Sequence, residues 1–318
     1  MYKIITFAKP KGFYRCLEWL MRDDALLSKT KQYSQVGSLL IPEEDLETLY
    51  AKLSKKEKKR LDVSDEVTVR VHDTVLTQEA EVVVSADQVP WGVRRIGAPD
   101  YWDRTKGNGI RVAVIDTGIS RLHPDLKGQV KGRITVTNNG KGYETIDGHG
   151  THVAGTIAAL ANKRGVVGVA PQVELYDVRA FGPDGTANMS DIIEGINWAI
   201  EKRVHVINMS FGTPQPHSGL ENAIRRAYRA GIVLVASAGN NGGTLEYPAA
   251  YNGVIAVGAI DSSGRVADFS ARGADTLAPG VSIKSTWLKK SYRTLDGTSM
   301  AAAHVSGLYA LRIGARRR

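Results

Sequence analysis

Short, continuous runs of Val, Ile and Ala, separated by segments of helical character, constrain the fold of this chain more than any other feature. The runs are Ile110–Asp116, Val173–Ala180, Val204–Met209, Ile232–Ala236 and Val254–Ala259, and the helical segments are His149–Ala161, Ser190–Lys202, Leu220–Ala230 and Ser299–Leu311. A strand that is apolar on both faces is typical of a parallel sheet covered by helices. The pattern therefore predicts an α/β fold with a doubly wound, mostly parallel sheet and helices on both faces.

Polar residues stand at or just past the carboxyl ends of three of these runs. Asp116 ends the first run, and Ser210 and Asn240 follow the third and the fourth. In open α/β sheets, ligands bind beyond the carboxyl ends of the strands. We therefore expect the functional site at this edge of the sheet.

Three motifs contain the residue types of a nucleophilic hydrolase. Asp116 precedes a Thr-Gly turn, His149 begins a helix of small residues, and Ser299 follows Gly-Thr in the first turn of an Ala-rich helix. A lone serine at a helix start is usually an N-cap, but Asp, His, Ser is one of the chain orders of Ser-His-Asp triads. In such a triad, His149 would take the proton of the Ser299 hydroxyl, and Asp116 would hold the imidazole tautomer.

Two further histidines lie in the same helical segments. His149-x-x-His152 is a possible metal pair, but no His-Glu-x-x-His signature accompanies it, which disfavours a zinc hydrolase. We expect His152 and His304 to be packed, hydrogen-bonded residues of their helices.

These motifs resemble the three catalytic motifs of the subtilisin-like serine proteases (subtilases, peptidase family S8). Further matching runs are Val206–Gly212, Ala236–Gly242 and Ala278–Gly280, so that the resemblance covers roughly residues 87–311. It implies a serine endopeptidase that hydrolyses polypeptide substrates through an acyl-enzyme. It also implies that Asp116, His149 and Ser299 are catalytic and that Asn240 contributes to the oxyanion hole with the Ser299 backbone N–H.

The resemblance also implies an extended substrate between two edges of a cleft. Gly182 and Gly185 belong to one edge, and Ser210, Phe211 and Gly212 to the other; Ser237, Ala238 and Gly239 form a wall of the primary specificity pocket. Glu246 falls where the pocket has its floor. If Glu246 points inward, the enzyme favours Lys or Arg before the cut; the alternative is a surface glutamate.

A structural calcium site follows from the same resemblance. Asp125 and the loop that contains Leu160, Asn162, Arg164 and Val166 match the family's ligands, and Asp87 matches a ligand near the N-terminus of the catalytic domain. Oxygen ligands on an irregular loop suit Ca²⁺, although Lys163 and Arg164 repel a cation. We expect no organic cofactor.

Residues 1–80 indicate a small α+β domain that precedes the catalytic domain. Its expected strands are Tyr2–Ala8, Tyr33–Ile41 and Glu66–Leu76, and its expected helices are Phe13–Leu27 and Glu43–Leu61. By position and order it resembles the propeptide of many subtilases, which implies a folding aid and intramolecular inhibitor. Residues 81–88 form the expected linker and 89–318 the catalytic domain. We predict that the strand before Val89 occupies the cleft and is self-cleaved between about Ala80 and Asp87; an uncut interdomain strand is the alternative.

The composition argues against a disulfide-rich protein, a membrane-spanning protein and a nucleic-acid-binding protein. Cys16 is the single cysteine, which excludes a disulfide within the chain. No apolar run of about 18 residues indicates a membrane span. The net charge of +9 lies in residues 87–318, but without an aromatic-interleaved basic motif or zinc-finger spacing we expect no nucleic-acid partner. The N-terminus has no secretory signal pattern, so we expect a cytoplasmic protein, or a secreted one if a signal has been removed upstream.

Two departures from the family pattern leave an alternative function open. Ala303 stands where the family usually has Pro, and family domains generally continue with another helix and a strand beyond the nucleophile helix. We therefore expect a C-terminally shortened catalytic domain. The alternative is a non-catalytic, subtilisin-like binding protein or an inactive truncated variant.

Overall fold

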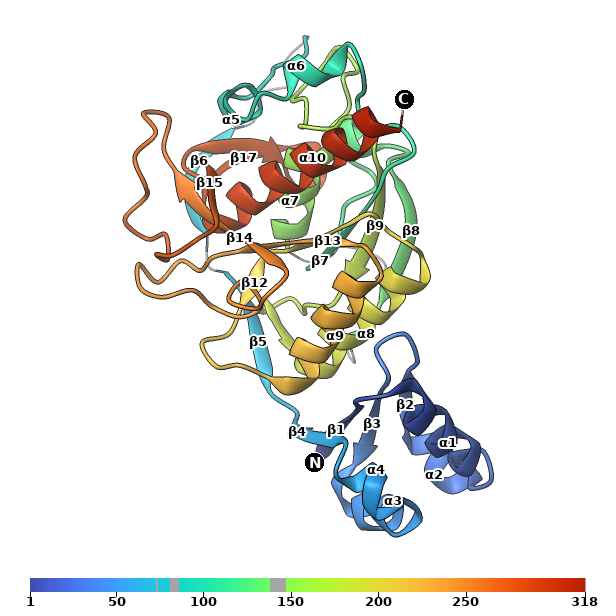
Figure 1. The fold of residues 1–318 in the computed structure, drawn as a ribbon. Helices are drawn as coiled ribbons and strands as arrows, with labels where there is room; N and C mark the ends of the chain where they lie inside the picture. Colours follow the sequence, from blue (N-terminus) through green and yellow to red (C-terminus); the bar gives the residue numbers. More distant parts are fainter. Residues whose placement is uncertain (73, 81–85, 138–146, 318) are drawn as a thin grey trace.

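A computed structural model of the chain describes residues 1–72, 74–80, 86–137 and 147–317. Its largest element is a seven-stranded sheet in which all neighbouring strands are parallel (Figure 1). In sheet order, the strands are β15 (Thr276–Pro279), β14 (Val254–Ile260), β13 (Val233–Ser237), β11 (Val206–Met209), β7 (Arg111–Asp116), β9 (Glu174–Arg179) and β8 (Val130–Thr135). The predicted parallel α/β fold is confirmed.

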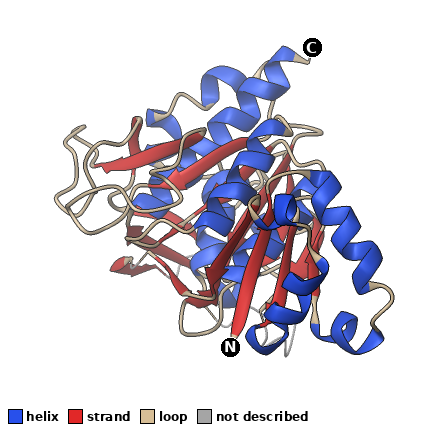
Figure 2. Cartoon of the chain, turned by 60° about the horizontal axis from the view of Figure 1, so that its bottom comes forward, coloured by secondary structure: helices blue, strands red, loops and turns tan. Residues whose placement is uncertain are grey.

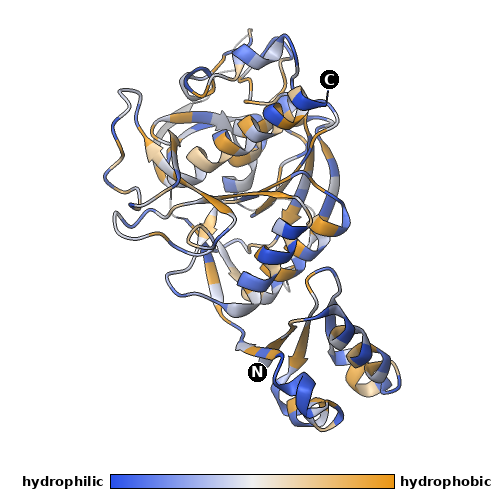
Figure 3. Ribbon diagram, in the orientation of Figure 1, coloured by the Kyte–Doolittle hydropathy of each residue, from blue (hydrophilic) through white to orange (hydrophobic). Residues whose placement is uncertain are grey.

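Apolar side chains on both faces of the central strands explain why the sheet lies between two layers of helices. Along β7, Val112 and Val114 pack into one core, whereas Ala113 and Ile115 pack into the other, because alternate side chains of a strand point to opposite faces. Helices α7 (His149–Ala158) and α10 (Thr298–Arg316) contribute to the first core, and α8 (Met189–Glu201) and α9 (Ser218–Arg229) to the second. Figure 2 shows helices on both sides of the strands, and Figure 3 shows the hydrophobic residues concentrated on the central strands.

The N-terminal part is a second, smaller layer structure. Its antiparallel sheet has the order β2 (Lys31–Tyr33), β3 (Ser38–Pro42), β1 (Tyr2–Phe7) and β4 (Leu61–Asp65), and its helices are α1 (Pro10–Leu20), α2 (Asp24–Lys29), α3 (Leu46–Lys52) and α4 (Lys55–Lys58). Ile5 and Phe7 of β1 face these helices, whereas Ile4 joins the core of α8 and α9. One face of the small sheet therefore packs against its own helices, and the other packs against the larger part.

Three details of the N-terminal part differ from the sequence prediction. The helix expected over Phe13–Leu27 is broken, because Asp23 caps a new helix by accepting the Leu26 N–H at 3.1 Å. The strand expected over Tyr33–Ile41 is a hairpin that turns at Gly37, which has a φ of 63°. The helix expected over Glu43–Leu61 is interrupted and ends before β4, which pairs with β1.

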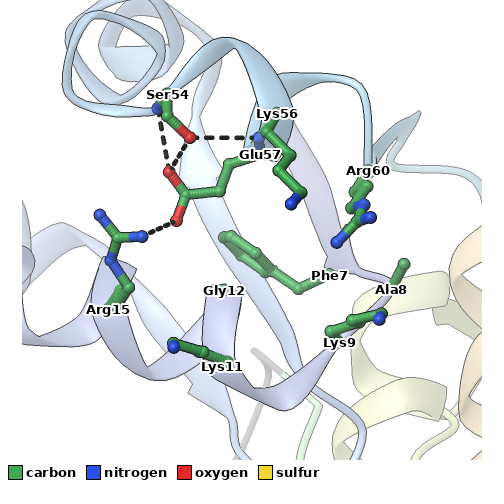
Figure 4. Close-up of a pocket in the computed structure, with 10 residues that line it drawn as sticks. All are labelled: Phe7, Ala8, Lys9, Lys11, Gly12, Arg15, Ser54, Lys56, Glu57 and Arg60. Atoms are coloured by element: carbon green, nitrogen blue, oxygen red, sulfur yellow. Dashed lines mark hydrogen bonds and ion pairs between the residues drawn. The ribbon is translucent and has the colours of Figure 1, made fainter.

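A cavity of about 230 Å³ lies in the N-terminal part (Figure 4). Glu57 closes one side of it by accepting the Ser54 N–H at 2.9 Å and pairing with Arg15 at 3.0 Å. The rest is lined by Phe7, Ala8 and Gly12 and by further basic residues, namely Lys9, Lys11, Lys56 and Arg60. None of the predicted site residues is among its lining residues.

The single strand expected over Glu66–Leu76 is wrong: the chain beyond Asp65 forms two strands, which leave the small sheet and join the larger part. Strand β5 (Thr68–Val71) lies between β10 (Thr186–Asn188) and β12 (Phe211–Gly212), antiparallel to both. Strand β6 (Val75–Ala80) pairs with β17 (Tyr292–Asp296), which pairs in turn with β16 (Ile283–Thr286). We expected the strand before Val89 to lie in the cleft, but the structure has β5 there; residues 81–85 lie outside the described residues.

The remaining elements are short. They are α5 (Trp91–Arg95), α6 (Pro99–Trp102) and the 3₁₀ turns η1 (Glu43–Asp45), η2 (Pro124–Leu126) and η3 (Leu288–Lys290).

Cys16 is buried and unpaired, and burial raises the pKa of its thiol to about 12. Across the described ranges, no helix is both long and apolar enough to cross a membrane.

Candidate active site

Asp116 is the last residue of β7 and is fully buried at the carboxyl edge of the sheet. Its Oδ1 accepts the Thr117 backbone N–H at 2.7 Å and the His149 Nδ1–H at 2.8 Å. A side chain on Gly150 would lie 2.6 Å from the Gly118 carbonyl oxygen and 3.0 Å from Asp116 Oδ1. Glycine at position 150 therefore allows the start of α7 to approach the carboxylate closely.

His149 is the first residue of α7, and neighbouring polar residues fix its position. Its backbone N–H donates to Asp147 Oδ1 at 2.7 Å, and the Gly150 N–H donates to Thr117 Oγ1 at 3.1 Å. The Nε2 atom is buried and has no hydrogen-bond partner among the described residues. Burial disfavours the imidazolium, but the charge and hydrogen bond of Asp116 outweigh it and raise the pKa of His149.

Ser299 lies in the first turn of α10, which packs against α7. Its Oγ donates to the Ser210 carbonyl oxygen at 3.4 Å, a long contact that restrains the hydroxyl only weakly. Ser210 in turn donates to the Ser299 carbonyl at 3.4 Å and accepts from Asn208 at 2.9 Å. The Ser299 side chain is therefore held at the end of β11, on the same edge of the sheet as Asp116.

Asn240 lies beside the start of α10. Its Oδ1 accepts both the Thr298 backbone N–H at 2.9 Å and the Thr298 hydroxyl at 2.7 Å. This orients the side-chain amide, and Nδ2 lies 3.3 Å from the position that a Cβ on Gly297 would take. A polarised N–H group is therefore fixed beside the start of the helix that carries Ser299, which suits the stabilisation of an oxyanion.

The cleft beside these residues is filled by β5 of the same chain. Val71 pairs with Phe211 and Arg70 pairs with Gly212 on one side, while Arg70 pairs with Thr186 on the other. The Val71 N–H donates to the Gly185 carbonyl at 3.0 Å, and Gly182 closes the turn that carries Gly185, as its N–H donates to the Thr186 carbonyl at 2.8 Å. The two predicted edges of the cleft are thus brought together around an extended peptide.

The His72 side chain fills the predicted specificity pocket. Its Nδ1 lies 2.6 Å from Ser237 Oγ, and its Nε2–H donates to Glu246 Oε2 at 2.9 Å. A side chain on Gly212 would collide with His72 and Glu246, and one on Gly239, where φ is 118°, would touch Glu246. The Glu246 N–H donates to the Ala238 carbonyl at 3.0 Å. Glu246 therefore points inward, and the hydrogen bond from His72 holds the pKa of Glu246 below its ordinary value.

Comparisons with known proteins found a matching family and several similar proteins. The Subtilase family (Peptidase_S8) matches residues 107–317. The chain is 41% identical to M-protease of Shouchella clausii over 312 residues, which are 97% of this chain and 80% of that protein. It is 46% identical to Subtilisin Savinase of Lederbergia lenta over 230 residues, 71% of this chain and 84% of the relative. Intracellular serine protease of Paenibacillus polymyxa is 41% identical over 249 residues, which are 74% of this chain and 75% of that protein.

The chain belongs to the subtilase family.

The residues predicted for calcium also lie together in this subtilase. Asp125 is buried and accepts the Val166 N–H at 3.1 Å, an Asn162 amide N–H at 3.2 Å and the Tyr292 hydroxyl at 2.8 Å. The Asp125 carbonyl accepts the Leu160 N–H at 2.8 Å, and Asp87 Oδ1 accepts the Arg164 N–H at 3.1 Å. Two carboxylates thus flank one loop, and Asn162 Oδ1 is buried without a hydrogen-bond partner among the described residues.

The other histidines of the subtilase motifs are packed as predicted. His152 Nε2 lies 3.0 Å from the Ile283 carbonyl and 3.1 Å from that of Arg293, and burial lowers the pKa of His152 to about 3. His304 Nδ1 lies 2.8 Å from the Met300 carbonyl, and burial lowers its pKa to about 4. Among the described residues, no group of three or more His, Cys, Asp or Glu side chains is arranged to hold a metal.

Several residues of the site were not singled out by the sequence analysis. Thr117 and Asp147 position the start of α7, Thr298 orients Asn240, and His72 occupies the pocket. Thr117, Asp147 and Thr298 are adjacent to motif residues, so proximity in sequence was an available signal. His72 lies 174 positions from Glu246, and no local pattern connects them.

Proposed function

We propose that this subtilase is a serine endopeptidase in which Ser299 is the nucleophile, His149 the general base and Asp116 the residue that orients His149. One observation carries this proposal: Asp116 fixes His149 through Nδ1, which leaves the buried Nε2 without a partner and with a lone pair available. Because α7 and α10 pack together, Nε2 lies at the same edge of the seven-stranded sheet as the Ser299 hydroxyl. A base oriented in this way activates a serine hydroxyl.

The proposed reaction begins with attack of Ser299 Oγ on the substrate carbonyl carbon as its proton moves to His149 Nε2. Asn240 Nδ2 and the Ser299 backbone N–H donate to the oxyanion. His149 then gives the proton to the leaving amine, and the peptide bond breaks to form an acyl-enzyme. A water molecule, deprotonated by His149, hydrolyses the ester and restores the serine.

The test is Ser299→Ala, which removes the nucleophile from a fully buried position with little change in volume. We expect kcat for a peptide substrate to fall by about 10⁶-fold, with an unchanged melting temperature. Ser306→Ala is the matched control, because Ser306 is a buried serine of the same helix that donates to Asn208 at 2.8 Å. Equal activity in the parent and the Ser299 variant would show that Ser299 is not the nucleophile, and no activity in either would favour the alternative, a non-catalytic binding protein.

We also propose that the N-terminal part inhibits the enzyme within the same chain, so that the protein is made as a self-inhibited precursor. The support is the position of β5, which is bonded to both edges of the cleft and excludes another peptide from it. Intact precursor should hydrolyse a peptide substrate slowly until β5 leaves. Constant activity from the time of mixing, without any change in chain length, would contradict this proposal.

We propose a preference for a cationic residue before the cut. Glu246 points into the pocket, and its partner there is the imidazole of His72. Peptides that differ only in that residue test the proposal: Lys or Arg should be favoured, and Glu246→Gln should remove the preference. A preference for Leu or Phe in the parent would contradict it.

Finally, we propose a structural Ca²⁺ bound by Asp125, Asn162, Asp87 and carbonyl groups of Leu160, Arg164 and Val166. The orphaned, buried Asn162 Oδ1 and the two carboxylates that flank its loop fit a hard cation. When bound, the ion supplies no chemistry to the reaction. It links the loop to the residues at the start of the catalytic domain.

A further inference from the structure

The cavity in the N-terminal part carries an excess of positive charge. Five cationic side chains and one carboxylate line it, so that its formal charge is +4. Figure 4 shows the cationic residues around the ring of Phe7; they are Lys9, Lys11, Arg15, Lys56 and Arg60. Like charges around so small a space repel one another, and an anion in the cavity would relieve that repulsion.

The single carboxylate of the cavity is already occupied by two partners. Glu57 Oε2 accepts the Ser54 N–H at 2.9 Å and the Ser54 hydroxyl at 2.5 Å, and Glu57 Oε1 pairs with Arg15 at 3.0 Å. The hydrogen bonds from Ser54 hold the pKa of Glu57 below its ordinary value, so the carboxylate stays charged. Glu57 therefore compensates the charge of Arg15 and leaves the other four cations.

Those four cations have no ion-pair partner within the described parts of the chain. Elsewhere in the N-terminal part, lysines do pair with carboxylates: Lys3 lies 3.1 Å from Glu43 and 2.6 Å from Asp65, and Lys29 lies 3.7 Å from Asp45. Acidic residues are thus present in this part of the chain, but only one of them lines the cavity.

Packed elements hold the walls of the cavity. Phe7, at the end of β1, is buried and packs edge-on against Phe13 of α1, with 5.8 Å between the ring centroids. A Cβ on Gly12 would lie 3.3 Å from Phe7 Cδ1, so the absence of a side chain there leaves space beside the ring. The Ala8 N–H donates to the Arg60 carbonyl at 3.1 Å, which fixes the backbone of Arg60 beside the end of β1.

The size and surroundings of the cavity favour a small molecule over a peptide. Strand β1 lies between β3 and β4 and pairs with both, so it offers no free edge to which an extended peptide could add. A volume of about 230 Å³ suits a ligand of a few functional groups. Lysine and arginine side chains are the usual partners of phosphate oxygens in proteins.

We propose that this cavity binds a small, soluble phosphate compound with two or more negative charges, such as a diphosphate. Lys56 and Arg60 donate to its oxygens from one side, and Lys9 and Lys11 from the side of the β1–α1 turn. Binding would connect this turn to α4. The site is separate from the proposed active site, because none of the proposed catalytic residues lines it, and its failure would leave the proposed function untouched.

The test is a calorimetric titration of inorganic pyrophosphate into the full-length chain at a fixed ionic strength of about 0.15 M. The Ser299→Ala background keeps the chain intact during the titration. We expect one saturable site per chain. Lys56→Glu and Arg60→Glu should each raise Kd by about tenfold or more, because each replaces a charged hydrogen bond by a repulsion.

The matched controls change the charge equally without touching the cavity. Lys55 and Lys59 are exposed, flank the two tested residues in the sequence and do not line the cavity, so Lys55→Glu and Lys59→Glu should change Kd by less than about threefold. Ala8→Leu fills part of the cavity at constant charge and should also weaken binding. Melting temperatures without pyrophosphate, which should stay at the parent value for these exposed positions, exclude misfolding as the cause.

Several results would overturn the proposal. Absence of saturable binding to the parent is the first. An equal rise of Kd in the lining and control variants would show diffuse attraction to a basic surface, and an unchanged Kd in the Ala8 variant would place pyrophosphate outside the cavity. Tighter binding of hexaglutamate than of pyrophosphate would assign the cavity to acidic peptides.

Discussion

The carboxyl edge of the seven-stranded sheet and the strand that lies across it are held in different ways. Asp116, His149 and Ser299 are buried. Hydrogen bonds from neighbouring residues fix Asp116 and His149, and one long hydrogen bond to Ser210 restrains the Ser299 hydroxyl weakly. Strand β5 is held mainly by backbone hydrogen bonds to β10 and β12, together with the buried Val69 and the side chain of His72. The bonds of the first arrangement come from the catalytic part itself; the second arrangement depends on a peptide of suitable shape.

Because of this difference, we expect substitutions in the two regions to change different measured quantities. Backbone pairing accepts many sequences, so selectivity rests on the few side chains that enter pockets. A substitution at the edge of the sheet should therefore change kcat, while one at the contacts of the N-terminal part should change how long that part stays bound. The predictions below test this separation.

The largest expected effect is that of Asp116→Asn. The asparagine would favour the wrong tautomer of His149, and kcat should fall by about 10⁴-fold. His149 acts as a base when it is neutral, so kcat/KM rises as the pH increases through its pKa. Because the Asp116 carboxylate raises that pKa above the ordinary value of 6.5, the variant should reach its plateau at lower pH. A pH profile of kcat/KM for both proteins measures the shift.

Asp191→Asn is the matched control for Asp116. Asp191 is a buried carboxyl of α8, outside the proposed site, and burial raises its pKa to about 7. Its amide variant should retain kcat and the parent pH profile. An unchanged profile in the Asp116 variant would mean that Asp116 does not tune His149.

Asn240→Ala should have the second largest effect. Loss of one oxyanion donor lowers kcat by about 10²–10³-fold, with little change in KM. The variant also loses the acceptor for Thr298, so its melting temperature is measured in parallel. Asn252→Ala is the control, because Asn252 is exposed and is none of the proposed site residues. Equal losses of kcat in the two variants would place the oxyanion donor elsewhere.

The parallel sheet was predictable because its strands are apolar on both faces. Val112 and Val114 face one core, and Ala113 and Ile115 face the other. Burial of both faces is visible in the sequence as a run of apolar residues that ends in Asp116. The motifs of the proposed triad are equally local, since Asp116 ends β7, His149 begins α7 and Ser299 lies in the first turn of α10. The residues at the carboxyl edge of the sheet could therefore be predicted mostly from their positions at the ends of predicted strands and helices.

The N-terminal part was less predictable because its elements depend on distant partners. Leu61–Asp65 follows a Lys-rich helix and has few apolar residues, but it becomes β4 by pairing with β1, about 60 residues earlier. His72 stood on the polar side of an alternating strand, and only the folded chain reveals that Ser237 and Glu246 receive it. Hydrophobic periodicity in a sequence cannot predict a contact between side chains that are more than 160 residues apart.

Arg226→Ala should change the association of the two parts by about tenfold or more. Arg226 of α9 is half-buried and donates to the Phe7 carbonyl at 2.8 Å, a charged hydrogen bond between the parts worth about 1.5–3 kcal/mol. After self-cleavage, the N-terminal fragment should leave faster, which shortens the lag before peptidase activity appears. Arg225→Ala is the control, because the exposed Arg225 donates to Asn222 within the same helix. Equal lags in the two variants would show that the contact with Phe7 does not limit release.

Calcium should affect stability and leave kcat almost unchanged, because its proposed ligands lie away from the triad residues. In the Ser299→Ala background, which prevents self-digestion, calcium at about 100 times its Kd stabilises the folded state by about 2.7 kcal/mol. For a domain of this size that corresponds to a rise of roughly 5–10 °C in Tm relative to chelator. Asn162→Ala removes the orphaned Oδ1 and should lose most of the rise, whereas Asn252→Ala, at an exposed loop position, should keep it. A rise that persists in the Asn162 variant would mean that calcium binds elsewhere.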